Sequence, residues 1–229
     1  AASEPRAAFD RMEAHGKNPL RKMEKSPMMT KEDLPMLVFA THNANKAAEV
    51  ERMLEGRYRI LTLNDIGCNE EIIEDATTLE GNAQIKARYV KTQYGLDCFA
   101  DDTGLEVDAL DGLPGVKTAR YAGENADSSA NMEKLIHALD GVSEDKRQAR
   151  FRTCICLIQG EEEVVLKGVC EGRIALALEG TEGFGYDPIF HPNSESRTFA
   201  EMSPAEKNTV SHRGQAVRKM VNALLARFQ

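Results

Sequence analysis

One short segment constrains the fold of this chain more than any other. The apolar stretch 98–100 is followed at once by Asp101-Asp102-Thr103-Gly104. An apolar stretch that stops in this way predicts a buried strand, residues 97–101, that ends at a turn. In open α/β sheets ligands bind at the carboxyl ends of strands, and two adjacent carboxylates need a cation or a proton to compensate their repulsion. The segment therefore predicts a ligand site; the alternative is a turn whose acids hydrogen-bond its own backbone.

Composition excludes several classes of partner. The 229 residues carry 29 Lys and Arg against 37 Asp and Glu, a net charge of −8. A protein that grips a nucleic-acid backbone needs a clustered basic surface, so we expect no nucleic-acid partner. No stretch approaches the roughly 18 apolar residues of a membrane span, so we expect no membrane partner either. The five cysteines include no C-x-x-C pair, which predicts buried thiols in a reducing cytoplasm.

The character of the sequence changes near residue 35. Residues 1–35 are polar and have no sustained apolar period, so we expect a mobile N-terminal extension. Residues 36–229 carry the periods of strands and helices and are expected to form one folded domain. Strands are predicted at 36–40, 58–63, 97–101, 150–158, 163–170 and 172–178. Helices separate the early strands and a hairpin joins two later ones, which predicts an α/β fold with a mixed central sheet flanked by helices.

Polar residues mark where helices begin. Thr77 with Glu80 forms a predicted capping box, and Asp127 is a predicted cap for a second helix. A last helix is predicted from the apolar positions between residues 217 and 228.

The six residues after the first strand are candidates for binding phosphate. A loop that leaves a strand and enters a helix presents free backbone N–H groups and the positive end of the helix dipole. The segment comprises Thr41, His42, Asn43, Ala44, Asn45 and Lys46. It is not a Walker loop, because the sequence G-x-x-x-x-G-K-[ST] is absent. The alternative is that an Asn only caps the helix and Lys46 is solvated.

Two later segments can bind the rest of a nucleotide. Residues 180–188 contain three glycines within six residues, which let a ligand approach the backbone, and Phe184 and Tyr186 offer a stacking face for a base. Lys207, His212 and Arg213 supply three donors within seven residues. Taken alone, the first segment is better explained as a turn with core aromatics, and the second as ordinary surface charges.

Asp102 is the candidate for metal binding and catalysis. A carboxylate there can hold Mg²⁺ and orient or deprotonate a water. Three upstream acids are possible partners, of which Glu74 is preferred; the others are Glu70 and Glu71.

Together these segments resemble the Ham1-like inosine triphosphate pyrophosphatase family. The resemblance covers residues 36 to about 228, and its motifs follow the family's order. They are Thr41-x-Asn43-x-x-Lys46, Thr78-Leu79-Glu80-Gly81-Asn82-Ala83, Ala100-Asp101-Asp102-Thr103-Gly104-Leu105, Leu113-Pro114-Gly115, Ala119-Arg120-Tyr121-Ala122-Gly123, Gly183-Phe184-Gly185-Tyr186-Asp187-Pro188 and Ser211-His212-Arg213-Gly214. Any one motif is unspecific, whereas all of them in this order are specific.

The resemblance implies a two-lobed fold with the active site in the cleft between the lobes. It implies Mg²⁺-dependent hydrolysis of ITP, dITP and XTP to the monophosphate and pyrophosphate by a homodimer. Asp102 matches the family's proton acceptor and metal-site residue, and Glu71 and Glu74 compete for its metal-site glutamate. The implied substrate contacts are Thr41, His42, Asn43, Ala44, Asn45, Lys46, Thr103, Phe184, Gly185, Tyr186, Asp187, Lys207, His212 and Arg213. The alternatives are a pyrophosphatase for a modified pyrimidine triphosphate and a nucleotide-binding regulatory protein without turnover.

Overall fold

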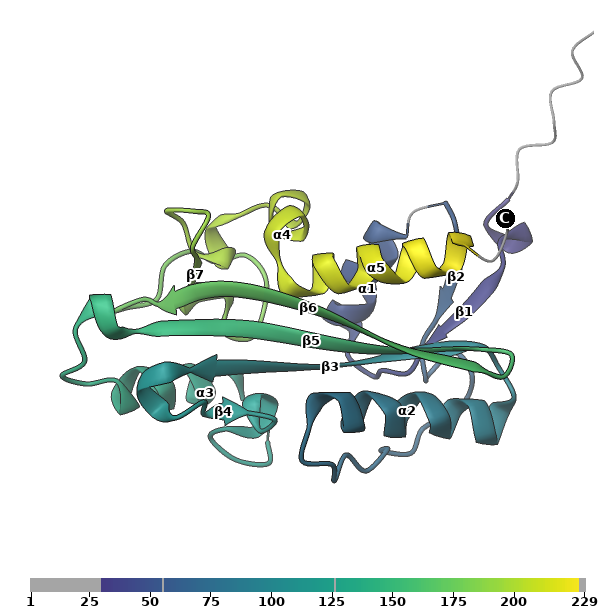
Figure 1. Cartoon of the computed structure of the whole chain (residues 1–229), viewed down its shortest axis with the longest axis horizontal. Coiled ribbons are helices and arrows are strands. Elements are labelled where there is room, and N and C mark those ends of the chain that lie inside the picture. The colour runs from purple at the N-terminus through teal and green to yellow at the C-terminus, as the bar shows by residue number, and fades with distance from the viewer. Residues whose placement is uncertain (1–29, 55, 126, 227–229) are drawn as a thin grey trace, which may run out of the picture.

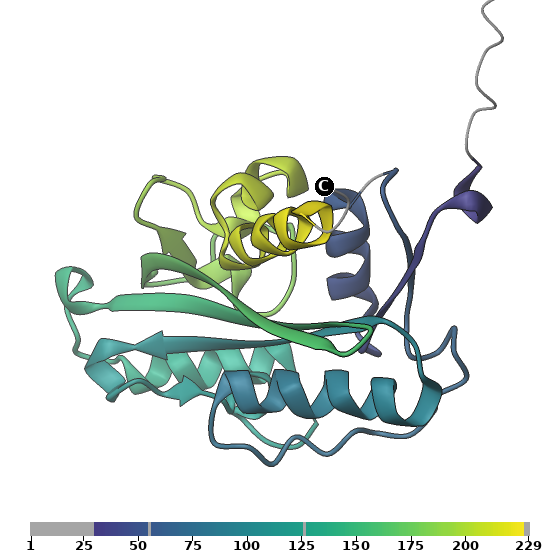
Figure 2. The ribbon, with the colours of Figure 1, turned by 45° about the vertical axis from the view of Figure 1, so that its right-hand side comes forward.

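The computed structural model describes residues 30–54, 56–125 and 127–226 (Figures 1 and 2). Most of the expected N-terminal extension, residues 1–29, lies outside the described residues. Its last residues contain a short 3₁₀ helix, η1 (Lys31–Asp33). Within the described part of the chain, no helix combines the length and the apolar character that a membrane crossing requires.

A mixed sheet of seven strands organises the domain, as the order of predicted elements indicated. Three parallel strands lie in the order β2 (Arg59–Leu61), β1 (Met36–Phe39) and β3 (Cys98–Val107). The antiparallel strands β5 (Gln148–Gln159), β6 (Glu162–Ile174) and β7 (Phe190–Pro192) follow. The two-residue strand β4 (Pro114–Gly115) pairs with β3. The predicted hairpin is confirmed, with its turn at Gly160.

Helices cover both faces of this sheet. The helix α2 (Leu79–Tyr94) lies along one face, and α1 (Ala44–Met53) and α5 (His212–Ala226) lie on the other (Figure 1). The helix α3 (Ser128–Ala138) lies at the end of the sheet away from α1, near β4, and α4 (Pro204–Val210) leads into α5. Asp127 caps α3 as predicted, because its carboxylate accepts from the backbone N–H groups of Ser129 and Ala130.

Each helix buries one face in a separate part of the core. Ala83, Ala87 and Val90 of α2 pack against the sheet beside Cys98 and Cys156. On the opposite face, α1 and α5 pack on Phe99, Ile155 and Leu157. A third cluster joins α3 to the far ends of β3 and β5 through Leu135, Leu105 and Phe151. All five cysteines are free and buried, as predicted.

Three local predictions are wrong, and tertiary pairing explains the first. The strand at Cys98 does not end at the two acids, because β3 continues to Val107. It is held by ten consecutive antiparallel pairs with β5, from Cys98↔Ile158 to Val107↔Ala149. The acids therefore lie in the middle of a strand and not at a turn.

The cap of α2 is one residue later than predicted. Thr78, not Thr77, caps the helix, and its hydroxyl accepts from the Gly81 N–H at 3.0 Å. No glutamate can complete a capping box from that position, because residue 81 is glycine. A Cβ on Gly81 would lie 2.7 Å from the Ala76 Cβ, so the tight approach of the preceding loop favours glycine there.

The strand predicted at residues 172–178 is not a separate element. Its first part, to Ile174, is the end of β6, and the third strand of this region is β7, which pairs antiparallel with β6. The apolar residues Leu176 and Leu178 lie after the strand and are exposed.

Gly168 sets how closely α5 approaches the sheet. A Cβ there would come within 2.0 Å of the His212 carbonyl oxygen and 2.8 Å of the Ala216 nitrogen. We therefore predict that Gly168→Ala forces α5 away from β6 and lowers the free energy of unfolding by about 1–3 kcal/mol, as overpacking does. Urea denaturation measures this loss. Val164→Ala on the exposed part of β6 is the control, with an expected change within about 0.5 kcal/mol; equal losses in both variants would contradict the close-approach argument.

Candidate active site

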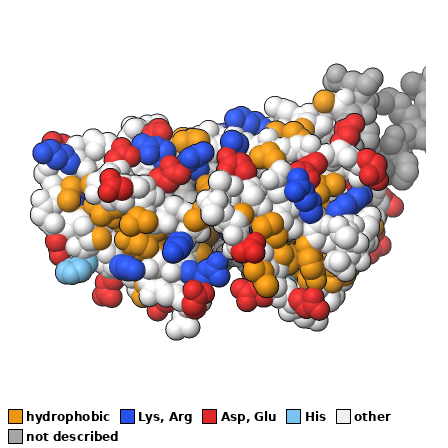
Figure 3. Space-filling view, turned by 60° about the horizontal axis from the view of Figure 1, so that its bottom comes forward, with side chains coloured by type: hydrophobic (Ala, Val, Ile, Leu, Met, Phe, Trp, Pro, Cys, Tyr) orange, Lys and Arg blue, Asp and Glu red, His pale blue; other side chains and the backbone are white. Residues whose placement is uncertain are grey.

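The candidate site lies where β3 changes its neighbours. One edge of β3 pairs with β5 throughout. On the other edge β1 pairs only as far as Phe99, and β4 pairs from Leu105 onward. The stretch between them opens into a cleft of about 620 Å³, which Asp102 and Thr103 line. The face of the molecule on the side of α2 and α3 shows a hollow near its middle, with Lys and Arg side chains on its α3 side (Figure 3).

Most of the predicted site residues line this one cleft. They come from the start of α1, the loop before α2, β3, the glycine-rich loop, α4 and the start of α5. The predicted residues that line it are Asn43, Asn45, Lys46, Glu71, Glu74, Asp102, Thr103, Phe184, Gly185, Tyr186, Asp187, Lys207, His212 and Arg213. Segments up to 170 residues apart in the sequence are thus brought to one place, since Asn43 and Arg213 both line it.

Four predicted residues lie outside the lining: Thr41, His42, Ala44 and the metal-ligand candidate Glu70. The His42 ring hydrogen-bonds Asn64 Oδ1 at 3.0 Å and the Glu70 carbonyl oxygen at 3.1 Å, so it ties two loops together. The Thr41 hydroxyl accepts from the Asn43 N–H, and Ala44 opens α1. The helix cap that we considered as the alternative is also present, because Asn43 Oδ1 accepts from the Lys46 N–H at 3.1 Å.

The two adjacent acids have opposite environments. Successive side chains of a strand point to opposite faces, so Asp101 points toward α1 and α5 while Asp102 points toward α2. Asp102 is half-buried, and each of its oxygens accepts one hydrogen bond, from Asn82 Nδ2 and from the Thr103 N–H, both at 3.0 Å. The pKa of Asp102 is raised, because the effect of burial outweighs the opposing effect of the positive charges of Lys86 and Lys46. Asp102 is therefore an oriented carboxylate with raised basicity.

Asp101, by contrast, is fully committed to ion pairs. It is 2% exposed, and it contacts Lys46 Nζ at 3.1 Å and Arg213 Nε at 3.2 Å. Burial by itself would raise the pKa of Asp101, but the charges of Lys46 and Arg213 dominate and hold it well below the ordinary range. The protein thus supplies the cations expected beside the two acids: they form ion pairs with Asp101, whereas Lys86 and Lys46 act on Asp102 through their nearby charge.

The same ion pairs continue across the cleft floor through Glu49. This buried residue of α1 contacts Arg213 at 2.5 Å and Lys207 Nζ at 3.1 Å. Lys207 in turn contacts Asp187 at 2.8 Å. We call this series the buried charge chain: Lys46, Asp101, Arg213, Glu49, Lys207 and Asp187. It joins the phosphate-binding candidate Lys46 to the glycine-rich loop.

The glycine-rich loop wraps around Asp187. Asp187 Oδ2 accepts from the Phe184 N–H at 2.9 Å, and a Cβ on Gly183 would collide with that carboxylate. The Phe184 ring is partly exposed in the cleft, with Lys207 Nζ 4.7 Å from its centroid. Tyr186 is instead buried, and its hydroxyl donates to the Thr118 carbonyl oxygen at 2.7 Å. One aromatic, Phe184, is thus available for stacking, where the sequence suggested two.

His212, the first residue of α5, lines the cleft. Its ring stacks on Phe151, with centroids 4.5 Å apart and an angle of 14°. Burial, together with the nearby charges of Arg213 and Lys207, lowers the pKa of His212 well below its ordinary value. The ring is therefore neutral at physiological pH, and its buried Nδ1 has no partner among the described residues.

Glu74 is the better candidate for a second metal ligand. Both glutamates line the cleft, but the negative charge of Glu74 contributes to the raised pKa of Asp102, and Glu74 also contacts Lys86 Nζ at 3.1 Å. Glu70, the third candidate, accepts from the Tyr89 hydroxyl at 2.6 Å. Among the residues that the structure describes, no group of three or more His, Cys, Asp and Glu side chains could hold a metal. Mg²⁺ needs only one or two carboxylates when substrate phosphates complete its shell, so Asp102 and Glu74 fit it.

Sequence reasoning missed three residues of this site. Glu49 stands three residues after Lys46 and therefore on the same face of α1, a spacing that could have drawn attention to it. Asn82 and Lys86 stand four apart on α2, and Lys86 Nζ donates to the Asp101 carbonyl oxygen at 2.6 Å. The available signal was their spacing, because Asn82 and Lys86 occupy positions on the same helix face as the apolar residues Ala83, Ala87 and Val90.

The contrast between the two acids predicts opposite effects on stability at pH 7. A lowered pKa means that ionised Asp101 stabilises the fold, so Asp101→Asn should cost about 3–5 kcal/mol, as expected when a buried ion pair loses one partner. A raised pKa means that ionised Asp102 destabilises the fold, so Asp102→Asn should leave the free energy of unfolding unchanged or raise it. Urea denaturation of both variants gives the answer, and similar losses in the two would contradict the assignment.

Comparison with known proteins identifies the same family that the sequence motifs resemble. The Ham1 family model matches residues 37–223. A protein from Flavobacterium johnsoniae named dITP/XTP pyrophosphatase is 50% identical over 190 residues, 83% of this chain and 98% of the relative. One of the same name from Caldanaerobacter subterraneus is 45% identical over 196 residues, 84% and 98% of the two chains.

Solved structures agree. The Staphylococcus aureus Ham1 protein superposes with a TM-score of 0.75 at 34% identity, over 85% of this chain and 100% of that one. A HAM1 protein from Coxiella burnetii gives 0.76 at 38% identity, over 84% and 100%. The chain belongs to the Ham1 family.

Proposed function

We propose that this chain, a nucleoside-triphosphate pyrophosphatase of the Ham1 family, hydrolyses dITP, XTP and ITP to the nucleoside monophosphate and pyrophosphate. Relatives that are 50% identical over nearly their whole length bear the name dITP/XTP pyrophosphatase. The observation that carries the proposal is the cleft that joins an oriented, basic carboxylate, Asp102, to the cations of the Lys46 and Arg213 segments.

Asp102 is the residue that handles the attacking water in this proposal. Its two oxygens are fixed by Asn82 and by the Thr103 N–H, which leaves a lone pair on each for a water. The raised pKa of the carboxylate makes it a better proton acceptor than an exposed aspartate. It holds the water against the α-phosphorus and takes its proton as pyrophosphate leaves. Lys46 and the N–H groups at the start of α1 bind the phosphates.

Mg²⁺ is the cofactor that we propose, held by Asp102 and Glu74. When bound, it supplies Lewis-acid neutralisation of the phosphate oxygens. Lys86 forms an ion pair with Glu74 and so offsets the negative charge of this carboxylate in the absence of a metal.

The base end of the cleft offers one ring face and several donors. Phe184 supplies the stacking surface, while Lys207 and Arg213 can donate to the O6 of hypoxanthine or xanthine. Neutral His212 adds no positive charge there. A site built to donate to an oxygen rejects an amino group at the same position, which favours these bases over adenine.

Two further expectations concern the protein in the cell. We expect a cytoplasmic location, with which five free, buried thiols are consistent. We also expect the homodimer that the family resemblance implies, which light scattering of the purified chain would test.

The experiment that tests the proposal is a substrate panel. Pyrophosphate release is measured from ITP, dITP, XTP, ATP and GTP with Mg²⁺, and again after chelation of the metal. We expect rapid release from the first three and loss of activity on chelation. Preference for a modified pyrimidine triphosphate, or nucleotide binding without release, would replace the proposal by one of the alternatives.

Asp102→Asn isolates the chemical step. The substitution keeps the shape of the side chain and one of its two accepted hydrogen bonds, but it removes the negative charge and the proton acceptor. We predict that less than about a tenth of the wild-type kcat remains, a barrier increase above about 1.4 kcal/mol, with an undiminished melting temperature. A kcat above that level would remove Asp102 from its assigned role.

Lys46→Ala and Phe184→Ala separate the two ends of the cleft. Lys46→Ala should raise KM for ITP and weaken inhibition by tripolyphosphate, which has no base. Phe184→Ala should weaken nucleotide binding by about 1–3 kcal/mol, the value of one stacking face, and leave inhibition by tripolyphosphate unchanged. Both are assayed well below their melting temperatures because Lys46 also pairs with Asp101. Equal effects on tripolyphosphate would overturn the division into a phosphate end and a base end.

A further inference from the structure

The cleft contains five cationic side chains, and four of them are paired at 3.2 Å or less with carboxylates that are at most 30% exposed. Lys46 and Arg213 contact Asp101, Lys207 contacts Glu49 and Asp187, and Lys86 contacts Glu74. Apart from Glu74, these carboxylates are almost fully buried. Pairing of this kind fixes the position of each cation but leaves less of its charge for a ligand.

Carboxylates are equally numerous among the cleft residues. Those that line it are Glu71, Glu74, Asp102, Glu124 and Asp187, against the cations Lys46, Lys86, Arg120, Lys207 and Arg213. The lining is therefore close to neutral before any metal binds. A triphosphate carries several negative charges. Beside any metal, it would therefore be bound best by a cationic side chain whose carboxylate partner can be exchanged easily for a phosphate.

Arg120 is the cation that meets this condition. It ends the short helix η3 (Thr118–Arg120), which follows β4 on the far side of the cleft from α1. Its side chain is 44% exposed, and its carboxylate partner is Glu124, at 3.6 Å and 87% exposed. An exposed pair at this spacing contributes only about 0.3–0.5 kcal/mol, so a phosphate can displace Glu124 at little cost.

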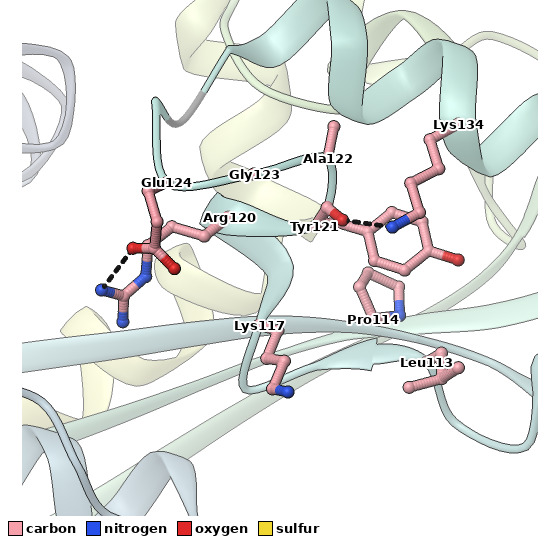
Figure 4. A pocket seen from close by; sticks show the side chains of 9 residues that line it. All are labelled: Leu113, Pro114, Lys117, Arg120, Tyr121, Ala122, Gly123, Glu124 and Lys134. Atoms are coloured by element: carbon pink, nitrogen blue, oxygen red, sulfur yellow. Dashed lines mark hydrogen bonds and ion pairs between the residues drawn. The ribbon is translucent and has the colours of Figure 1, made fainter.

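Arg120 also stands between two cavities. A second pocket of about 520 Å³ adjoins the cleft, and Arg120 and Glu124 line both. In that pocket Arg120 and Glu124 lie together at one side, whereas Lys134 lies over the Tyr121 ring at the other (Figure 4). Lys117 lines the second pocket but not the cleft. Arg120 thus lines the cleft with a side chain that remains accessible to a ligand.

We propose that Arg120 binds phosphate oxygens of the substrate, exchanging Glu124 for the triphosphate and closing on it from the wall opposite Lys46. The proposal rests on the proposed function, because it assumes a triphosphate in this cleft. The planar guanidinium presents two parallel N–H donors to a phosphate, which a lysine cannot do. The segment that follows β4 would then also contact the phosphates.

Arg120→Ala tests the proposal, with Lys117→Ala as the matched control. Lys117 is an exposed cation three residues earlier that does not line the cleft, so its loss changes net charge equally. We expect Arg120→Ala to raise KM for ITP by about tenfold or more, the effect of one lost charge-assisted contact, with a smaller change in kcat. Lys117→Ala should leave both constants near the wild-type values. Arg120→Lys should restore KM only in part, because it keeps the charge and loses the paired donors.

Two inhibitors that each resemble one half of the substrate show which half Arg120 contacts: tripolyphosphate has no nucleoside, and inosine has no phosphate. Arg120→Ala should weaken inhibition by tripolyphosphate and leave inhibition by inosine unchanged. The proposal is overturned if Arg120→Ala and Lys117→Ala give the same KM, or if inosine rather than tripolyphosphate is the inhibitor affected.

The same variants remain informative if the proposed function fails. A wild-type chain that released no pyrophosphate would disprove the hydrolase assignment alone. Calorimetric titration with tripolyphosphate would still compare the wild type with Arg120→Ala, and equal affinities would then overturn the proposal for Arg120.

Discussion

The buried charge chain from Lys46 to Asp187 is the interaction on which the rest of this site depends. It connects α1, β3, the glycine-rich loop and the consecutive helices α4 and α5, which come from distant parts of the sequence. Each buried charge has at least one partner of opposite sign, as burial requires. An ion removed from such a chain leaves its partner uncompensated, so the chain ties Lys46 to the glycine-rich loop and makes the loss of any one member costly.

The neighbouring acids show how a strand separates structure from chemistry. The two-residue period of β3 sends Asp101 into the charge chain and Asp102 into the cleft. Cations lower the pKa of the first, and burial raises the pKa of the second. Asp101 is thus committed to ion pairs inside the protein, whereas Asp102 keeps lone pairs that face the cleft. The gap between β1 and β4 on the edge of β3 gives the ligand access to those lone pairs.

Local sequence signals located most elements; they misplaced the cap of α2 by one residue, and they failed on the limits of β3, where a distant strand decided the outcome. The hairpin around Gly160 and the Asp127 cap depend on neighbouring residues and were predicted correctly. The strand predicted to end at Asp101 continues because β5, some fifty residues later, pairs with it throughout. Glu49 was missed for a related reason, since it matters through its burial beside Arg213, a residue far away in the sequence.

The sequence by itself determined the order of strands and helices, the family resemblance and the residue types of the site, because periodicity, caps and motifs are local. Only the tertiary structure decided which of two adjacent acids lines the cleft, which cations are committed to buried carboxylates, and that Tyr186 is held in the core by its hydrogen bond to Thr118. Those outcomes depend on burial and on charges brought together from distant segments, and neither quantity exists until the chain has folded.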